Sequence, residues 1–481
     1  MSQYPLRRTK IVATMGPAID DPRMMEKVIH AGVDLFRANF SHGSADDHQK
    51  RIDLARKIAQ KCGKIVGILA DLQGPKIRVS RFKAGKITLK PGQSFILDAE
   101  FDSNAGDEHC VGIDYKALPK DVHRNDTLLL DDGLIVLHVD KVEQAKIFCT
   151  VKEGGVLSNN KGINRLGGGL SAKALTEKDK EDIKIAARLN VDYVAVSFPR
   201  SAADIDEARA LLKAAGSNAG LVAKIERSEA VKAIDEIIRA SDAVMVARGD
   251  LAVEVGDAEV PAIQKHIIQR ARALDKAVIT ATQMMESMIL HPIPTRAEVS
   301  DVANAVLDGT DAVMLSAETA TGAHPDKVVA AMDRICHTAE RNRITQVSGH
   351  RVECRFERVD EALAMATMYT ANHFNIKAII ALTESGSTPL WMSRIRSGIP
   401  IFGLSRHTAT QRRMTLYRGV YPIHFDLSET NWSDIEVHAI KELEKRVIVK
   451  YGDLVILTKG DHIGIHGGSN VMKILEVGKI G

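Results

Sequence analysis

Short, continuous apolar runs alternate with stretches of helical periodicity over most of the first 340 residues. Apolar strands that alternate with helices in this way are typical of a parallel sheet that is covered by helices. Three runs precede residue 75 and five follow residue 170, and a total of eight predicts a closed (β/α)8 barrel, the TIM barrel. The runs are Lys10–Thr14, Val33–Phe36, Ile65–Ala70, Asp192–Phe198, Leu221–Glu226, Ala243–Ala247, Ala277–Gln283 and Asp311–Glu318.

Two other regions break this rhythm. Between residues 75 and 170 the chain shows short alternating strands separated by Gly, Asp and Asn turns, which predicts an all-β domain inserted after the third barrel strand. We expect the polar, glycine-rich segment 154–169 to close this insertion. Beyond residue 343, helices and strands alternate again in a separate α/β region. The predicted domains are a TIM barrel formed by two separate segments (1–74 and 171–342), a β lid inserted between them (75–170) and a carboxyl-terminal α/β regulatory domain (343–481).

Each barrel run ends in polar residues at its carboxyl end, which is where barrel enzymes carry their active sites. Lys224 and Glu226 are two residues apart on one strand and therefore share a face. If the next strand is a neighbour, Glu226 and Asp250 meet at that end. Two carboxylates without a nearby His or Cys favour a hard cation such as Mg²⁺ or Mn²⁺, and Lys224 could hold a transferring anion. The alternative is a set of solvated strand ends, but polar residues at the same end of all eight strands favour a site.

Composition excludes several other classes of protein. The net charge of +3 is spread along the chain and aromatic residues make up only 4%, which argues against nucleic acid as a partner. The sequence contains no apolar run of membrane-spanning length, and its start lacks the apolar core of a signal peptide. We therefore expect a cytoplasmic protein that does not act on a membrane. The five cysteines show no paired metal spacing and are expected to be reduced thiols: Cys62, Cys110, Cys149, Cys336 and Cys354.

Five longer motifs resemble those of pyruvate kinase, and are most similar to the bacterial type whose effectors are AMP or sugar monophosphates. They occur in the family's order and spacing, and the resemblance includes the β insertion and the last domain. The sequence contains neither a Walker A motif nor GxGxxG, and the family uses neither. The motifs are Asn39–Gly43, Gln73–Arg78, Met245–Leu251, Ala281–Met288 and Pro294–Glu298.

This resemblance implies transfer of a phosphoryl group from phosphoenolpyruvate to ADP, giving pyruvate and ATP in the last step of glycolysis. In the family's motif, Glu226 and Asp250 hold Mg²⁺ or Mn²⁺, which bridges the substrate carboxylate, enol oxygen and phosphate. Lys224 stabilises the transferring phosphoryl group and the enolate, and Arg37 grips the phosphate. By the same resemblance, Thr282 contacts the substrate carboxylate and organises the proton donor, and the backbone of Gly249 and Asp250 binds the substrate. Ser316 and Glu318 lie at the proton-relay face of the substrate. The nucleotide is contacted by Asn39, His42 and Arg78.

One departure from the family concerns its monovalent cation. Members that require K⁺ carry Glu where this chain has Lys76, and commonly Thr where it has Leu72. A lysine ammonium can supply the positive charge that K⁺ otherwise brings, so we expect activity without K⁺. The alternative is a solvated surface lysine next to Pro75. The corresponding cation region comprises Asn39, Ser41, Asp71 and Lys76.

The last domain carries a candidate effector site between a predicted strand and a predicted helix. Small hydroxyls and backbone N–H groups at a helix start can form an anion nest, here for a phosphorylated activator. The alternative is an N-cap loop without a ligand. The residues of this candidate effector loop are Thr383, Ser385, Gly386, Ser387 and Thr388.

The family also suggests a homotetramer.

Two other functions compete with phosphoryl transfer. A metal-dependent lyase of the pyruvate–aldehyde type could use a similar Glu/Asp barrel site, but it would lack the β lid and the last domain. A non-catalytic relative would be expected to lose Lys224, Arg37 or a metal carboxylate, and this sequence retains all of them.

Overall fold

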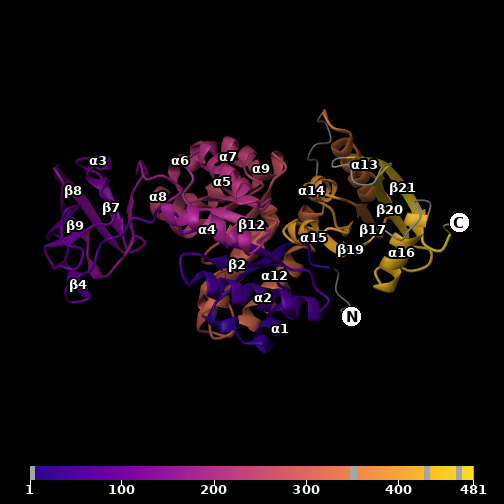
Figure 1. Cartoon of the computed structure of the whole chain (residues 1–481), viewed down its shortest axis with the longest axis horizontal. Coiled ribbons are helices and arrows are strands. Elements are labelled where there is room, and N and C mark those ends of the chain that lie inside the picture. Colours follow the sequence, from indigo (N-terminus) through magenta and orange to yellow (C-terminus); the bar gives the residue numbers. More distant parts are fainter. Residues whose placement is uncertain (1–5, 347–354, 427–433, 462–467, 480–481) are drawn as a thin grey trace.

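A computed structural model describes residues 6–346, 355–426, 434–461 and 468–479. Figure 1 shows three bodies in a row, with the β insertion at one end, the helix-covered barrel in the middle and the carboxyl-terminal domain at the other end. The order of these bodies in space matters for function, because the two outer domains contact the barrel at different places.

The central body is a closed, parallel, eight-stranded barrel in the order β1-β16-β15-β14-β13-β12-β3-β2, which confirms the predicted TIM barrel. Pairs such as Asn39 with Asp71 bring the carboxyl ends of neighbouring strands to the same rim. The barrel strands are β1 (Lys10–Thr14), β2 (Leu35–Asn39), β3 (Gly67–Asp71), β12 (Tyr193–Val196), β13 (Gly220–Ile225), β14 (Ala243–Ala247), β15 (Ala277–Ala281) and β16 (Ala312–Leu315).

Helices form the outer layer of the barrel, and several start at capping boxes. Ser44, Thr176 and Thr295 each exchange hydrogen bonds with the acidic residue three positions later, which satisfies N–H groups at the start of the helix. The helices of this body are α1 (Pro22–Ala31), α2 (Ala45–Lys61), α4 (Glu177–Arg188), α5 (Ala202–Ala214), α6 (Ser228–Lys232), α7 (Ile234–Ala240), α8 (Arg248–Val255), α9 (Val260–Ala273), α10 (Arg296–Asp308), α11 (Ala317–Ala320) and α12 (Pro325–Ala339).

The inserted domain contains a six-stranded sheet, β11-β7-β8-β9-β5-β6, and a two-stranded sheet, β10-β4. Strands β10 and β11 lie within the closing segment 154–169, where no strand was predicted. Both are short and pair with distant strands of the insertion, so the local pattern does not show them. The elements are β4 (Lys86–Leu89), β5 (Ser94–Asp98), β6 (Cys110–Gly112), α3 (Leu118–Asp121), β7 (Thr127–Leu130), β8 (Ile135–Glu143), β9 (Lys146–Glu153), β10 (Gly155–Ser158) and β11 (Ile163–Arg165).

The carboxyl-terminal domain is built on a five-stranded sheet, β19-β18-β17-β20-β21, in which only β21 is antiparallel to its neighbour. Helix α15 was not predicted, since its seven residues are too few to show a clear period. The elements are α13 (Val359–His373), β17 (Ala378–Leu382), α14 (Ser387–Ser393), β18 (Ile401–Ser405), α15 (Thr408–Met414), β19 (Val420–His424), α16 (Ile435–Lys445), β20 (Leu454–Gly460) and β21 (Ser469–Glu476).

This domain packs on the amino-terminal end of the barrel. Lys10 Nζ at the start of β1 donates to Val420 O at 2.6 Å, and the Tyr193 hydroxyl at the start of β12 donates to Arg413 O at 2.7 Å. One buried apolar cluster runs from the barrel interior into the domain. The carboxyl-terminal rim of the barrel is therefore left for a site beneath the inserted domain.

Two further observations concern the helices and the cysteines of the described residues. None of their helices combines the length and apolar character needed to span a membrane. Their cysteines are free thiols, as expected: Cys62, Cys110, Cys149 and Cys336. Cys354 lies outside the described residues.

Candidate active site

Four charged side chains form a buried network at the carboxyl ends of β2, β3 and β13. Arg37 Nε lies 2.6 Å from Asp71 Oδ2. Lys224 Nζ lies 3.3 Å from the other oxygen of Asp71 and 2.8 Å from Glu226 Oε1. Only 1% of each carboxylate side chain is exposed, so water does not screen these ion pairs effectively. The network therefore combines two cations and two anions in a nearly dry site.

Burial and pairing act against each other on the pKa values of this network. Burial lowers the pKa of Lys224, but Asp71 and Glu226 outweigh this effect and hold it above its usual value. Burial raises the pKa of Asp71, but Lys224 and Arg37 hold it below its usual value. Burial raises the pKa of Glu226 to about 7, because it outweighs the lowering effect of Lys224 and because the negative charge of Asp250 adds to it. Lys224 therefore stays charged, whereas Glu226 needs additional positive charge to remain fully ionised at neutral pH.

The two residues that follow β12 supply further contacts that position this network. Lys224 Nζ donates to Ser197 Oγ at 2.7 Å, and Ser197 Oγ donates to Leu72 O at 2.7 Å. The backbone N–H of Phe198 donates to Glu226 Oε2 at 2.8 Å. Neither Ser197 nor Phe198 is among the predicted site residues. Both stand at the carboxyl end of the predicted run Asp192–Phe198, and that position is the one signal in the sequence for their role.

The other half of the site lies where β14 and β15 end. Asp250 is in the first turn of α8, and 25% of its side chain is exposed. The N–H of Gly249 donates to Thr282 Oγ1 at 2.9 Å, so in this structure the threonine satisfies that amide. Thr282 and Gln283 have φ values of 66° and 53°, a left-handed conformation that is costly for a β-branched residue and that often marks a functional site.

Arg248, the other charge at the end of β14, has a structural role. Its Nη2 donates to Thr282 O at 2.6 Å, and its Nη1 lies 2.7 Å from Asp301 Oδ1. The arginine therefore clamps the strained turn at Thr282 against α10. We expect it to support the site without contacting a substrate.

Lys76 is directed toward the expected metal carboxylate. Its Nζ lies 3.5 Å from Asp250 Oδ1 and 3.9 Å from Asp132 Oδ1 of the inserted domain. About a third of the side chain is exposed. Of the other residues of the expected cation region, Asp71 pairs with Arg37 and Lys224, and Asn39 Oδ1 accepts from Ser41 N at 3.1 Å.

Glu318 holds the turn between β16 and α11. Its Oε2 accepts from Ser316 N at 2.6 Å and its Oε1 accepts from Met285 N at 3.2 Å. The side chain is buried, and burial raises its pKa. The structure thus brings Ser316 and Glu318 together, with both carboxylate oxygens occupied by backbone donors.

The three residues expected on the nucleotide side lie near the junction of the barrel and the insertion or at the end of β2. Asn39 is the last residue of β2, and His42 is exposed in the turn that follows it. Arg78 bridges to Gly162 within the insertion, and its N–H donates to Asp114 Oδ1 at 2.7 Å. No hydrogen bond involving a described residue ties down the side chain of His42 or Arg78.

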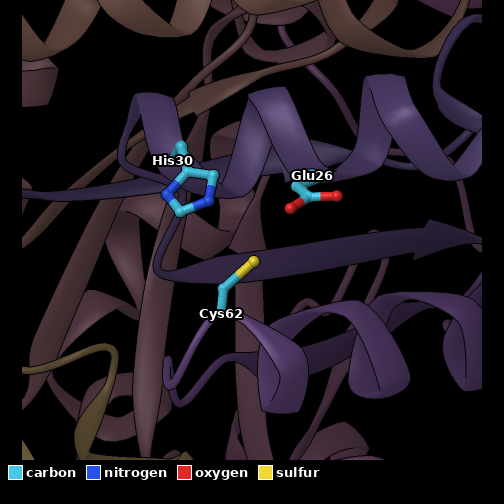
Figure 2. A group of neighbouring side chains, drawn as sticks. All are labelled: Glu26, His30 and Cys62. Carbon is cyan, nitrogen blue, oxygen red and sulfur yellow. The ribbon is translucent and has the colours of Figure 1, made fainter.

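A different group of potential metal ligands lies in the outer helical layer. Figure 2 shows Glu26 and His30 on α1 facing Cys62 at the end of α2. Their ligand atoms lie within 4.8 Å of one another, and this is the one such group of three or more found among the described residues. Thiolate and imidazole suit softer metals than Mg²⁺, and Glu26 is already paired with Lys61 at 2.9 Å. The hard-cation site is better sought at Glu226 and Asp250, where oxygen ligands face the barrel rim.

Comparisons with known proteins decide the family. Residues 6–329 match the family model "Pyruvate kinase, barrel domain", and residues 361–475 match "Pyruvate kinase, alpha/beta domain". The chain belongs to the pyruvate kinase family. Pyruvate kinase II of Salmonella typhimurium is 57% identical over 476 residues, covering 98% of this chain and 99% of the relative. The pyruvate kinase of Haemophilus influenzae is 56% identical over 459 residues, covering 95% and 96%. That of Staphylococcus aureus is 40% identical, covering 98% of this chain and 81% of the relative.

Membership of the pyruvate kinase family confirms several predictions at once. It confirms the barrel with a carboxyl-terminal α/β domain, and it makes the chain a phosphotransferase instead of an aldehyde lyase. It also implies dependence on a divalent metal and the use of phosphoenolpyruvate and ADP. The roles of individual residues, the identity of the ion and the effector remain predictions.

Proposed function

We propose that this chain transfers the phosphoryl group of phosphoenolpyruvate to ADP and then allows the enolate to be protonated to pyruvate. The observation that carries the proposal is the buried network of Arg37, Asp71, Lys224 and Glu226 at the carboxyl rim of a pyruvate kinase barrel. Phosphoryl transfer requires positioning and charge neutralisation more than covalent chemistry. A rigid set of charges is well suited to both.

Glu226 and Asp250 would hold the divalent cation, Mg²⁺ or Mn²⁺. The donor set fits, because both ligands are carboxylates and Asp250 is near enough to contribute to the raised pKa of Glu226. Lys224 lies beside Glu226 and Lys76 beside Asp250, yet the pKa of Glu226 stays raised, so a further cation would still be favoured between the two carboxylates. When bound, the cation would supply charge neutralisation at the phosphate and the enol oxygen.

Lys224 and Arg37 would bind and stabilise the transferring group. Asp71 holds both cations, so their charges point into the site without a cost of reorganisation at the moment of reaction. Arg37 also donates through Nη1 to Thr14 Oγ1 at 3.2 Å, which leaves its Nη2 without a hydrogen bond to a described residue. That donor is suited to an oxygen of the substrate phosphate.

Thr282 would orient the carboxylate of the substrate and the group that protonates the enolate. Its strained turn and its contact with Gly249 N place the hydroxyl between α8 and β15. Gly249 and Asp250 would offer backbone N–H groups to the substrate once Thr282 Oγ1 moves to it. Ser316 and Glu318 would complete the substrate side, and Asn39, His42 and Arg78 would contact ADP.

A coupled assay tests the activity directly. With phosphoenolpyruvate, ADP and Mg²⁺ we expect equal rates of pyruvate and ATP formation, measured by lactate dehydrogenase and by luciferase. Chelation of the cation should lower both rates at least about 100-fold, since it removes the charge that offsets the phosphate, and added Mg²⁺ should restore them. A folded protein that forms neither product with Mg²⁺ present would be a non-catalytic relative.

A phosphorylated effector such as AMP or a sugar monophosphate would bind the loop before α14. Gly386 has φ of 84°, its N–H donates to Thr383 Oγ1 at 2.9 Å, and the hydroxyls of Ser385 and Ser387 lie 3.0 Å apart. The hydroxyl of Thr388 is buried against that of Ser469 at 2.7 Å. Ser385 and Ser387 thus face the same space with small polar groups, which supports a phosphate pocket.

We expect Ser387→Glu to abolish activation by AMP and by sugar monophosphates and to leave the basal rate unchanged, because a carboxylate would repel the effector phosphate. Activation is measured as the shift in the phosphoenolpyruvate concentration for half-maximal rate. Ser103→Glu, at an exposed position of the insertion, adds the same charge and should leave activation intact. Normal activation of the Ser387 variant would discard this pocket.

Two further proposals rest on the family resemblance. We infer that activity does not depend on K⁺, because Lys76 supplies a positive charge beside Asp250.

We also infer a homotetramer, for which the exposed edge strand β21 is one available surface.

A further inference from the structure

A pocket lies where the amino-terminal end of the barrel meets the carboxyl-terminal domain, far from the network at the opposite rim. Both domains contribute arginines to its wall. Arg8 precedes β1 and Arg272 lies in the last turn of α9, whereas Arg394 and Arg396 follow α14 and Arg418 precedes β19. Six of its lining residues carry charge, and only one of these is acidic: Arg8, Arg272, Asp311, Arg394, Arg396 and Arg418.

Two of the five arginines have a carboxylate partner. Arg394 donates through two nitrogens to both oxygens of Asp311, and each side chain is 1% exposed. Arg8 Nε lies 3.6 Å from Glu340 Oε2, beside the pocket. In each of these two pairs the carboxylate offsets the charge of its arginine.

The other three arginines form no close ion pair with a described residue, although Glu340 acts on Arg418 and Asp308 on Arg396 at longer range. Arg396 donates only to the backbone oxygens of residues 307, 308 and 344. Arg418 Nη1 donates to Thr9 Oγ1 and to Thr310 O, both at 2.9 Å. Among the described residues, Arg418 Nη2 has no hydrogen-bond partner, although the residue is only 8% exposed. A buried guanidinium donor without an acceptor is costly, and it marks the place where a ligand would be stabilised.

Arg272 is the least satisfied of the three. Its Nη2 makes one long hydrogen bond, 3.3 Å, to Arg394 O. Burial, together with Arg396 and Arg394, lowers the pKa of Arg272 to about 10. A Cβ built on Gly309 would lie 3.0 Å from Arg396 Nη2 and 3.3 Å from Arg272 Nη1, so these two guanidinium groups converge above that glycine. Like charges that converge in a poorly hydrated pocket repel each other unless an anion lies between them.

We propose that this interdomain arginine pocket binds a small oxyanion of the phosphate type and so joins the carboxyl-terminal domain to the barrel. Arg272 would contribute from the barrel, and Arg396 and Arg418 from the other domain. Guanidinium groups suit this ligand because their planar donors match the oxygens of a phosphate in pairs. The pocket is small, so an inorganic ion fits it better than a nucleotide.

Inorganic phosphate is the probe, and its binding to the full-length protein is measured by isothermal titration calorimetry at constant ionic strength. We expect Arg272→Met and Arg396→Met each to weaken one phosphate site per chain at least about tenfold, the effect of losing one charge-assisted hydrogen bond. Arg341→Met, at an exposed position after α12, removes the same charge outside the pocket and should bind phosphate normally.

Phosphate could also bind the active site or the loop before α14, so Lys224→Met and Ser387→Glu are measured in parallel. Retention of the site in these two variants and its loss in the pocket variants would support the proposal. The proposal would be overturned if the phosphate site were lost only in Lys224→Met or only in Ser387→Glu. It would also be overturned if Arg272→Met bound phosphate as the wild type does. If a variant does not fold, hydrogen exchange of the wild-type chain provides a second test. Phosphate should slow amide exchange in segments 268–274 and 394–399. Unchanged exchange in these segments would equally overturn the proposal.

Discussion

Lys224→Met is expected to lower kcat about 10²–10³-fold, the size of effect seen when one preorganised charge is removed from a transition state. The ammonium lies between Asp71 and Glu226 and is held by Ser197, so its position is fixed before substrate binds. Methionine keeps a side chain of similar length and loses only the charge and its hydrogen bonds. The rate of pyruvate formation at saturating phosphoenolpyruvate, ADP and Mg²⁺ measures the effect.

Loss of stability must be separated from loss of catalysis in this variant. Removal of Lys224 leaves Asp71 and Glu226 with less positive charge in a buried site, which should also lower the thermal unfolding temperature. Rates are therefore compared well below that temperature, with Lys184→Met on the outer face of α4 as the charge control. A Lys224 variant whose kcat stays within fivefold of the wild type would exclude the proposed role.

The second large effect concerns Lys76 and the monovalent cation. In tetramethylammonium buffer without K⁺, the wild-type chain should keep more than a tenth of its activity, because the ammonium 3.5 Å from Asp250 already provides the charge. Lys76→Glu reverses that charge beside the expected metal ligand. We expect this variant to lose at least about tenfold in rate without K⁺ and to recover most of it when K⁺ is added, as expected for one unit charge at this distance in a partly screened site.

The control is Lys83→Glu, which makes the same charge change at an exposed position of the insertion. It should show no dependence on K⁺. Two results would refute the interpretation of Lys76: a tenfold or greater loss of wild-type activity without K⁺, or a Lys76→Glu variant that K⁺ does not rescue.

Much of the fold could be read from the sequence because barrel strands are buried on both faces and therefore appear as uninterrupted apolar runs. Ile65–Ala70 was predicted where β3 spans Gly67–Asp71, and the run predicted at Lys10–Thr14 has the same bounds as β1. β10 and β11 were missed for the opposite reason. They lie in a polar, glycine-rich segment and gain their stability from strands elsewhere in the insertion, which no local pattern reveals.

For the site, the sequence indicated which strand ends matter but not how they combine. Period-two geometry was enough to put Lys224 and Glu226 on one face. The position of Asp71 between Arg37 and Lys224 depends on the order β13-β12-β3-β2 in the closed barrel, which spacing alone does not determine. Likewise, Arg248 and Asp250 look equivalent in the sequence, yet the arginine is committed to Thr282 O and Asp301.

We propose that Glu226 and Asp250 form the divalent metal site at the mouth of the barrel. Binding of Mn²⁺, followed by electron paramagnetic resonance, measures the contribution of each carboxylate. Glu226→Gln and Asp250→Asn should each weaken Mn²⁺ at least about tenfold. Glu254→Gln, which alters a buried carboxylate bonded to Ser228 N, should bind Mn²⁺ as the wild type does. Wild-type Mn²⁺ affinity in both Glu226→Gln and Asp250→Asn would show that the metal binds elsewhere.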